Sequence, residues 1–181
     1  MARFRLKIGE KGPDFRLPGV DGKTVSMADF ASSPVLVVMF TCNHCPYVQA
    51  YEDRLIALQA EYAGKGVSFV AINANDETLY PEDAFEKMVA RAKSKRFNFS
   101  YLRNADQTVA SAYGAEYTPE IFVLDRERRL RYTGRIDDDW KDPGRVGRRD
   151  LKEAIEALLA GRPVTQPETY TIGCTIKWAD L

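Results

Sequence analysis

Two cysteines and the only histidine of the chain stand within four residues, in the sequence Cys42-Asn43-His44-Cys45. In a chain with βαβ character, the C-x-x-C spacing indicates a thiol–disulfide redox pair. Only the thiolate form of cysteine attacks a disulfide or a peroxide, and a free thiol at neutral pH is mostly protonated. The pair therefore needs surroundings that stabilise a negative charge on sulfur.

The residues beside the pair indicate how that charge is stabilised. A helical pattern begins at Pro46, which suits a first helical turn because its missing N–H is not needed there. The positive end of a helix favours an anion, so we expect Cys42, just ahead of the helix, to be the more activated thiol and the nucleophile. Cys45 is then the resolving thiol. When protonated, His44 would stabilise the thiolate further and make the disulfide more oxidising.

The elements on either side must hold this turn in place. An apolar run at residues 35–40 precedes it and indicates a strand that is buried on both faces. After Pro46, apolar residues recur at steps of three and four, which marks one face of a helix. They are Val48, Tyr51, Leu55, Leu58 and Tyr62. The cysteines are therefore expected at a strand-to-helix turn.

The rest of the chain alternates predicted strands and helices. An Asp-Gly turn at residues 21–22 predicts an N-terminal hairpin, and Ser26 begins a short helix that ends near Phe30. A polar loop at 73–76 lies at the carboxyl edge of the expected sheet, where ligands tend to be received. A long charged loop at 134–149 is of a length that is usually functional or mobile. Further strands are predicted at 67–72, 99–102, 121–124 and 130–133, and further helices near 81–92, 107–113 and 150–160.

Composition narrows the classes of function. The 181 residues suffice for one domain (1–181), with a core at about 9–161 and a C-terminal tail at 162–181. Lys and Arg total 26, as do Asp and Glu, so charge gives no reason to expect nucleic acid or a membrane as a partner. The sequence shows no signal peptide and no membrane-spanning run, and three cysteines are too few for a secreted disulfide scaffold. We therefore expect a cytoplasmic protein whose cysteine pair cycles.

Other uses of the same residues stay open. A C-x-x-C pair can be half of a zinc site that His44 or Cys174 completes, although the chain has no second pair at metal-binding spacing. The two cysteines could also be buried and inert. Cys174, in Gly173-Cys174-Thr175, could be a packed residue or a third redox thiol that forms a disulfide with Cys42 or Cys45.

The chain resembles the thioredoxin-like superfamily in its strand–C-x-x-C–helix turn and in Thr118-Pro119, which opens a later hairpin. Within that superfamily, three leading segments resemble the redoxin branch of alkyl hydroperoxide reductase and thiol-specific antioxidant proteins: 13–15, 21–23 and 26–30. Three others look like a peroxiredoxin-like thioredoxin subgroup: 42–48, 134–138 and 173–178. The resemblance extends from about residue 9 to residue 178.

The resemblance implies an α/β, thioredoxin-like fold: a central mixed sheet flanked by helices, with an N-terminal hairpin extension and a C-terminal tail. It also implies a cis peptide bond before Pro119, so that the backbone of Thr118 can pair with an extended substrate chain. Tyr47 would flank this groove, and Thr41 and Pro46 would modulate the cysteine pair together with His44.

Several positions depart from the family patterns. Thr41 replaces the tryptophan that thioredoxins carry before the first cysteine, and Pro46 replaces their basic residue after the second. The buried acid that thioredoxins use as a proton relay has no match at residues 35–40, so the base for Cys45 is unidentified. If Cys45 is set on the peroxidatic cysteine of peroxiredoxins, their activating arginine has only a weak counterpart in Arg135.

We therefore predict a thiol–disulfide oxidoreductase that exchanges disulfides with a protein or a small molecule. No bound cofactor is needed, because the electrons would come from a thioredoxin-type reductase or a small thiol. One alternative is a peroxiredoxin-like thiol peroxidase that reduces hydroperoxides through a sulfenic acid. An alternative of another class is a non-catalytic module that uses the same cysteines to bind a metal or a partner.

Overall fold

The computed structural model describes residues 4–180, so residues 1–3 and 181 of the expected domain lie outside the described residues. A five-stranded sheet forms its centre, built from β3 (Val35–Thr41), β4 (Val67–Asn73), β5 (Ser100–Arg103), β7 (Glu120–Leu124) and β8 (Leu130–Gly134). The strand order is β5-β4-β3-β7-β8. Strand β3 runs parallel to β4 and antiparallel to β7. The predicted central mixed sheet is confirmed.

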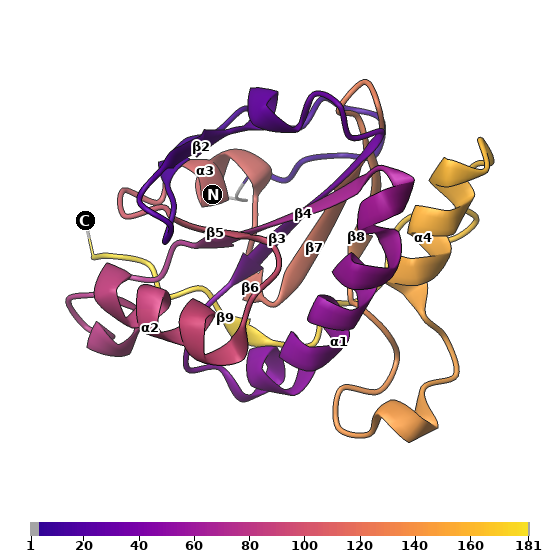
Figure 1. Cartoon of the computed structure of the whole chain (residues 1–181). Helices are drawn as coiled ribbons and strands as arrows, with labels where there is room; N and C mark the ends of the chain where they lie inside the picture. The colour runs from indigo at the N-terminus through magenta and orange to yellow at the C-terminus, as the bar shows by residue number, and fades with distance from the viewer. Residues whose placement is uncertain (1–3, 181) are drawn as a thin grey trace.

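Helices cover both faces of this sheet (Figure 1). On one face pack α1 (Pro46–Tyr62), α2 (Phe85–Lys95) and α4 (Asp150–Leu159), and on the other packs α3 (Thr108–Tyr113) with the N-terminal segment. Strand β3 contributes to both cores because successive side chains of a strand point to opposite faces. Its residues 35–40 are at most 1% exposed, as the apolar run predicts.

The N-terminal hairpin and the short helix after it are also present. Strands β1 (Arg16–Pro18) and β2 (Thr24–Ser26) pair antiparallel, and the 3-10 helix η1 (Met27–Phe30) follows. The backbone N–H of Ser26 donates to the Asp29 carboxylate over 2.8 Å, which caps that helix. The remaining 3-10 helices are η2 (Ala63–Lys65), η3 (Pro81–Asp83) and η4 (Pro143–Arg145).

The helix expected near Pro81 differs from the prediction. The chain forms the short helix η3 first, and α2 starts only at Phe85, because Ala84 between them is extended (φ −61°, ψ 155°). The two acidic residues at the start of the predicted helix therefore belong to a separate turn. One of them, Asp83, is fully buried.

The C-terminal tail lies against the body and does not project from it (Figure 1). The backbone N–H of Thr169 donates to the carbonyl of Thr133 in β8 over 3.1 Å. Further on, β9 (Cys174–Thr175) pairs antiparallel with β6 (Tyr117–Thr118), and Ile176 enters the core with 3% exposure. Within residues 4–180, no helix is long and apolar enough to cross a membrane.

Candidate active site

Both cysteines of the C-x-x-C sequence lie where β3 gives way to α1. The strand ends at Thr41 and the helix begins at Pro46, so Cys45 is the N-cap residue of α1. Both thiols are buried, with Cys42 2% and Cys45 0% exposed. A proline in the first turn removes one backbone N–H that the helix could not use. The predicted strand-to-helix turn is therefore present, with Cys45 nearer to the helix terminus than Cys42.

Thr118 contacts both sulfurs from across the fold. Its hydroxyl oxygen lies 3.5 Å from Cys42 Sγ, and its carbonyl oxygen lies 3.4 Å from Cys45 Sγ. The peptide bond between Thr118 and Pro119 is cis, as the family resemblance implies. Residues far apart in the sequence thus meet at the thiol pair.

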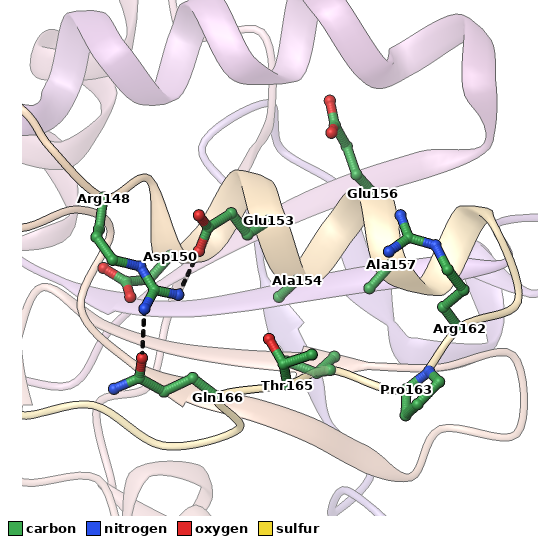
Figure 2. Close-up of a pocket in the computed structure, with 11 residues that line it drawn as sticks. Arg148, Asp150, Glu153, Ala154, Glu156, Ala157, Arg162, Pro163, Thr165 and Gln166 are labelled. Atoms are coloured by element: carbon green, nitrogen blue, oxygen red, sulfur yellow. Dashed lines mark hydrogen bonds and ion pairs between the residues drawn. The ribbon is translucent and has the colours of Figure 1, made fainter.

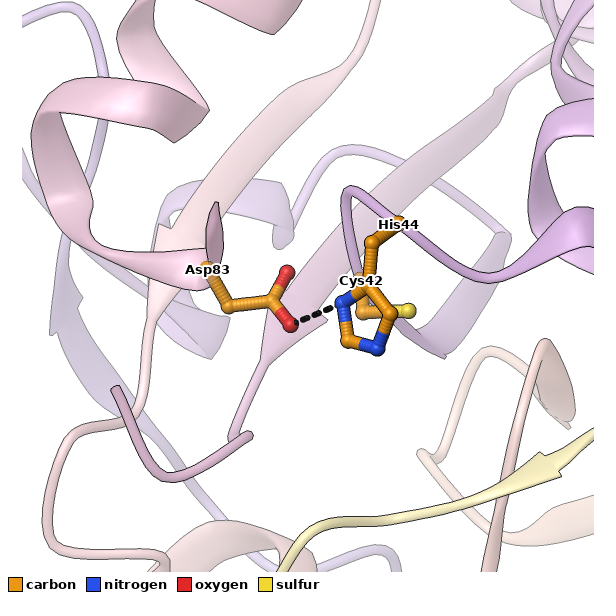
Figure 3. Close-up of side chains that lie close together, drawn as sticks. All are labelled: Cys42, His44 and Asp83. Atoms are coloured by element: carbon orange, nitrogen blue, oxygen red, sulfur yellow. Dashed lines mark ion pairs between the residues drawn. The ribbon is translucent and has the colours of Figure 1, made fainter. Parts of the chain in front are cut away.

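Asp83 is a site residue that the sequence analysis did not identify. Figure 3 shows its carboxylate facing the His44 ring, with Oδ2 2.6 Å from Nδ1, and Cys42 beside them. A face of the imidazole stacks on Tyr80, with ring centres 5.5 Å apart and planes 7° apart. A second acid, Glu82, is more distant, at 3.9 Å from Nδ1, and half exposed. The histidine is therefore held between a buried carboxylate and an aromatic ring.

Buried amides complete the surroundings of Asp83. Its Oδ1 accepts from the backbone N–H of Asn43 over 2.7 Å and from the side chain of Asn73 over 3.1 Å. Its Oδ2 accepts from the side chain of Asn75 over 3.0 Å. The hydrogen-bonding capacity of this buried carboxylate is therefore satisfied by neighbouring amides. The sequence predicts that the polar loop at 73–76 lies at this edge of the sheet, but no sequence pattern indicates that Asn73 and Asn75 contact Asp83.

The two thiols differ in how well they can carry a charge. The hydrogen bond from Cys42 lowers the pKa of Cys45, and the Cys174 thiol and the backbone N–H groups of Val48 and Cys174 lower it further, against the opposing effect of burial. The same hydrogen bond to Cys45, followed by burial and the negative charge of Asp83, raises the pKa of Cys42. The thiolate is therefore favoured on Cys45.

The expectation that Cys42 is the more activated thiol stays a prediction, and the contacts around the two sulfurs favour Cys45 instead. The expectation placed Cys42 just ahead of the helix, but Cys45 occupies the N-cap and gains most from the helix terminus. Cys42 lies three residues earlier and faces the Asp83 carboxylate, which opposes a second negative charge.

Cys174 joins the site as a third thiol. Strand β9 pairs Cys174 with Thr118, and this brings Cys174 Sγ to 2.7 Å from Cys45 Sγ. Cys174 is partly exposed, whereas the other two cysteines are buried. Burial and the neighbouring Cys45 raise its pKa. Of the two partners that the sequence left open for this cysteine, the structure places it against Cys45.

The expected substrate groove is partly filled by the chain itself. The backbone edge of Tyr117 and Thr118, which the resemblance implies is free for a substrate, pairs with β9. Tyr47 does lie beside the cysteines, and its ring contacts Trp140 edge-on with centres 4.5 Å apart. An extended substrate could reach the Thr118 backbone only after the tail had moved.

The ligand atoms of Cys42, His44 and Asp83 could hold a metal ion, since they all lie within 4.8 Å of one another. Both Asp83 oxygens, however, already accept hydrogen bonds from buried amides. A metal would have to displace the His44 ring from Oδ2, at 2.6 Å. A metal ion at this position would therefore compete with contacts that Asp83 already makes.

Arg135 and a polar pocket beside α4 have little bearing on the thiol chemistry. Arg135, the weak counterpart of the peroxiredoxin arginine, donates to Asp150 over 2.8 Å. A polar pocket lies between α4 and residues 162–166 (Figure 2), and there Arg148 donates to both Glu153 and Gln166 over 2.8 Å. None of the cysteines lines this pocket.

Comparisons with known proteins agree with a thiol-based chemistry. A family model described as Redoxin matches residues 7–153. The solved structure of an uncharacterized conserved protein from Geobacillus kaustophilus is 40% identical, with a TM-score of 0.92, and the match covers 97% of this chain and 94% of that one.

Two curated relatives have names that state an activity. "Putative peroxiredoxin" of Mycobacterium tuberculosis strain H37Rv is 28% identical over 141 residues, which cover 76% of this chain and 82% of that protein. The thiol-disulfide oxidoreductase ResA of Bacillus thuringiensis is 23% identical over 128 residues, which cover 70% of this chain and 68% of that protein. The two names correspond to the two enzymatic alternatives that the sequence left open.

Proposed function

Since this chain belongs to the redoxin family of thiol-dependent oxidoreductases, we propose that its reaction is thiol–disulfide exchange through the dithiol of Cys42 and Cys45. The observation that carries the proposal is the contact of one residue, Thr118, with both sulfurs at the terminus of α1. A structural pair of buried cysteines needs neither a lowered pKa nor a buried acid and histidine beside it. Perturbed titration in a specific cluster of charged partners is typical of functional sites.

The exchange proceeds in two steps. The Cys45 thiolate attacks one sulfur of the substrate disulfide, forms a mixed disulfide and expels the other substrate sulfur as a thiolate. Cys42 then attacks the Cys45 sulfur and gives its proton to a departing thiolate. The second substrate sulfur leaves, the substrate is reduced, and the Cys42–Cys45 disulfide remains. The order reverses the one expected from sequence, because the surroundings favour the thiolate on Cys45.

A mixed-disulfide trap tests this order. If Cys45 attacks first, the double variant Cys42→Ser/Cys174→Ser should accumulate the mixed disulfide on Cys45, because both thiols that could resolve it are missing. Cys45→Ser should accumulate little. Accumulation on Cys42 in Cys45→Ser, with none on Cys45 in Cys42→Ser/Cys174→Ser, would return the attacking role to Cys42.

A second candidate is a thiol peroxidase, which the lowered pKa and the burial of Cys45 favour. A hydroperoxide is small enough to approach a buried thiolate that a protein disulfide cannot reach while the tail covers it. Cys45 would take one oxygen from the peroxide and become a sulfenic acid, with release of hydroxide or an alcohol. A second thiol would then attack the sulfenic sulfur, release water and leave a disulfide.

Parallel rate measurements separate the two reactions. The fully reduced protein is mixed with hydrogen peroxide or with a protein disulfide, and the loss of thiols is followed for the wild type and for each cysteine-to-serine variant. Thiol–disulfide exchange predicts a slow reaction with peroxide and an exchange that is lost in Cys45→Ser. A fast peroxide reaction that is lost with one cysteine would make the protein a peroxidase and overturn the first proposal.

The reductant that completes the cycle is proposed to be a thioredoxin-type reductase or a small thiol. A cytoplasmic location, which is the expectation from the sequence, would supply both. The metal-binding alternative has its own test, since zinc at one ion per chain in the purified protein would favour it. A titratable dithiol without zinc would remove it.

A further inference from the structure

Strand β9 lies at the backbone edge where the family resemblance implies that a substrate would pair. It adds antiparallel to β6, with Cys174 opposite Thr118, whose oxygens contact both active-site sulfurs. Peptides that bind at sheet edges use this kind of backbone pairing. The chain thus places one of its own cysteines where the cysteine of an extended substrate would lie.

The tail is fixed on both sides of this cysteine. After Cys174, the backbone N–H of Ile176 donates to the carbonyl of Glu116 over 2.9 Å, and that of Lys177 donates to the side chain of Asn75 over 2.9 Å. Before it, Thr169 is bonded to β8. The Cys174 sulfur is therefore held beside Cys45 by the fold and does not depend on chance collisions of a free tail.

Gly173 is needed for this close approach. A Cβ atom at this position would lie 2.3 Å from the carbonyl oxygen of Thr118 and 3.4 Å from the backbone nitrogen of Pro119. A distance of 2.3 Å is a severe clash with backbone atoms, so a larger residue would push β9 away from β6. The glycine thus lets the third sulfur approach the pair.

We infer that Cys174 is a catalytic thiol that takes the disulfide over from the C-x-x-C pair and presents it to the reductant. The inference rests on the proposed function, which supplies the Cys42–Cys45 disulfide. Cys174 Sγ attacks Cys45 Sγ, the Cys42–Cys45 bond breaks, and a Cys45–Cys174 disulfide forms. The departing Cys42 sulfur takes up the proton that Cys174 gives up. No external oxidant or reductant is consumed in this step.

Transfer of the disulfide to Cys174 would make it accessible to a reductant. Cys42 and Cys45 are buried, and a reductant cannot reach either sulfur while β9 lies over them. Cys174 is partly exposed, so the thiolate of a small thiol or of a reductase can attack it. That attack expels Cys45 as a thiolate, and a thiol with a lowered pKa leaves faster. A second thiol of the reductant then resolves the mixed disulfide on Cys174, and all three cysteines are reduced.

Disulfide mapping with timed quenching tests the inference. The reduced full-length protein receives one equivalent of oxidised glutathione, free thiols are alkylated in acid, and the linked peptides are identified. We expect the Cys42–Cys45 disulfide early and the Cys45–Cys174 disulfide later. In Cys42→Ser, we expect Cys45–Cys174 alone. In Cys174→Ser, we expect Cys42–Cys45 to form, but its reduction by dithiothreitol should be at least about tenfold slower, because the intramolecular step is lost.

Two matched variants separate position from the mere number of thiols. The double variant Cys174→Ser/Thr175→Cys keeps three cysteines but moves the thiol to the opposite, exposed face of β9, because side chains alternate along a strand. We expect it to behave like Cys174→Ser. Gly173→Ala keeps Cys174 but displaces β9, and it should lower the yield of the Cys45–Cys174 disulfide.

The outcomes distinguish this inference from the proposed function. If Cys174→Ser is reduced as fast as the wild type, or if Cys42→Ser forms no Cys45–Cys174 disulfide, the inference is wrong and the dithiol exchange is untouched. If the double variant is reduced at the wild-type rate, the position of Cys174 has no role and the inference is also wrong. If Cys174→Ser forms no Cys42–Cys45 disulfide, the proposed function fails, and the inference fails with it.

Discussion

On the Cys42 side of the active-site turn, the neighbours are a carboxylate, an imidazole and a set of buried amides. On the Cys45 side, they are a helix terminus, a carbonyl oxygen and a third thiol. Asp83 opposes a negative charge on Cys42, whereas most of the polar contacts around Cys45 favour one. The thiols of Cys42 and Cys45 are chemically identical, but their surroundings shift their pKa values in opposite directions.

The comparison shows that the spacing of a redox pair does not by itself determine which sulfur reacts. The C-x-x-C sequence requires only that the thiols be close. Their assignment depends on which of them caps the helix and on what distant segments bring beside each one. Here η3 brings Asp83 to Cys42, and β9 brings Cys174 to Cys45.

The largest effect is expected from removing the favoured thiolate. The ultraviolet absorbance of thiolates, followed as the pH of the reduced protein is raised, should show one step far below the ordinary cysteine pKa of about 8.5. The pKa of Cys45 is lowered, so its thiolate persists as the pH falls through the range in which an ordinary cysteine becomes protonated. Cys45→Ser should abolish this step completely.

The matched variant is Cys42→Ser, which removes the other thiol of the pair. It should keep a step below the ordinary pKa, because a serine hydroxyl can still donate to Cys45, and Cys174 and the backbone N–H groups of Val48 and Cys174 also lower its pKa. The absorbance step at low pH could instead persist in Cys45→Ser and vanish in Cys42→Ser. That result would show that the thiolate forms on Cys42 and not on Cys45.

A smaller effect is expected on the Cys42 side, from Asp83→Asn. An amide at this position keeps one acceptor oxygen, but its NH2 group replaces the other oxygen and faces a donor, either Asn75 or the pair Asn43 and Asn73. An unsatisfied buried group costs about 1–3 kcal/mol. Urea unfolding of the reduced protein measures this loss. The pKa of Cys42 should fall as well, because the opposing charge is gone.

Glu82→Gln is the control for that prediction. Glu82 is adjacent in sequence and 3.9 Å from the same ring nitrogen of His44, but it is half exposed, and exposed ion pairs contribute about 0–1 kcal/mol. If the two variants destabilise the protein equally, burial of Asp83 does not distinguish the two acids. The role given to the buried carboxylate would then be wrong.

The elements that follow local rules could be predicted from the sequence. The apolar run of β3, the stripe of α1 and the capping residues of η1 each depend on neighbours within a few residues, and each was found at the predicted place. The mixed sheet and the cis bond before Pro119 came from the family resemblance, which adds what local patterns do not contain.

The contacts that make the surroundings of Cys42 and Cys45 differ could not be predicted from the sequence. Asp83 falls within the helix predicted near 81–92, but the extended backbone of Ala84 separates it from α2. Cys174 stands 129 residues after Cys45. Nothing local decides whether such a tail residue meets Cys42, Cys45 or neither. These contacts depend on long-range packing, for which a single sequence holds no pattern.

The smallest effect is expected from His44→Ala. A protonated imidazole would stabilise the reduced form, so its loss should make the disulfide less oxidising. The shift should be modest because the Asp83 carboxylate, 2.6 Å from Nδ1, offsets the charge of the ring. We expect a potential more negative by roughly 30 mV, which corresponds to about 1.4 kcal/mol. Equilibration with glutathione buffers measures it. Tyr80→Leu removes the stacked ring but keeps the imidazole, and it should shift the potential less. An unchanged potential in His44→Ala would show that the histidine does not tune the pair, and that the polar cluster acts on Cys42 through Asp83 alone.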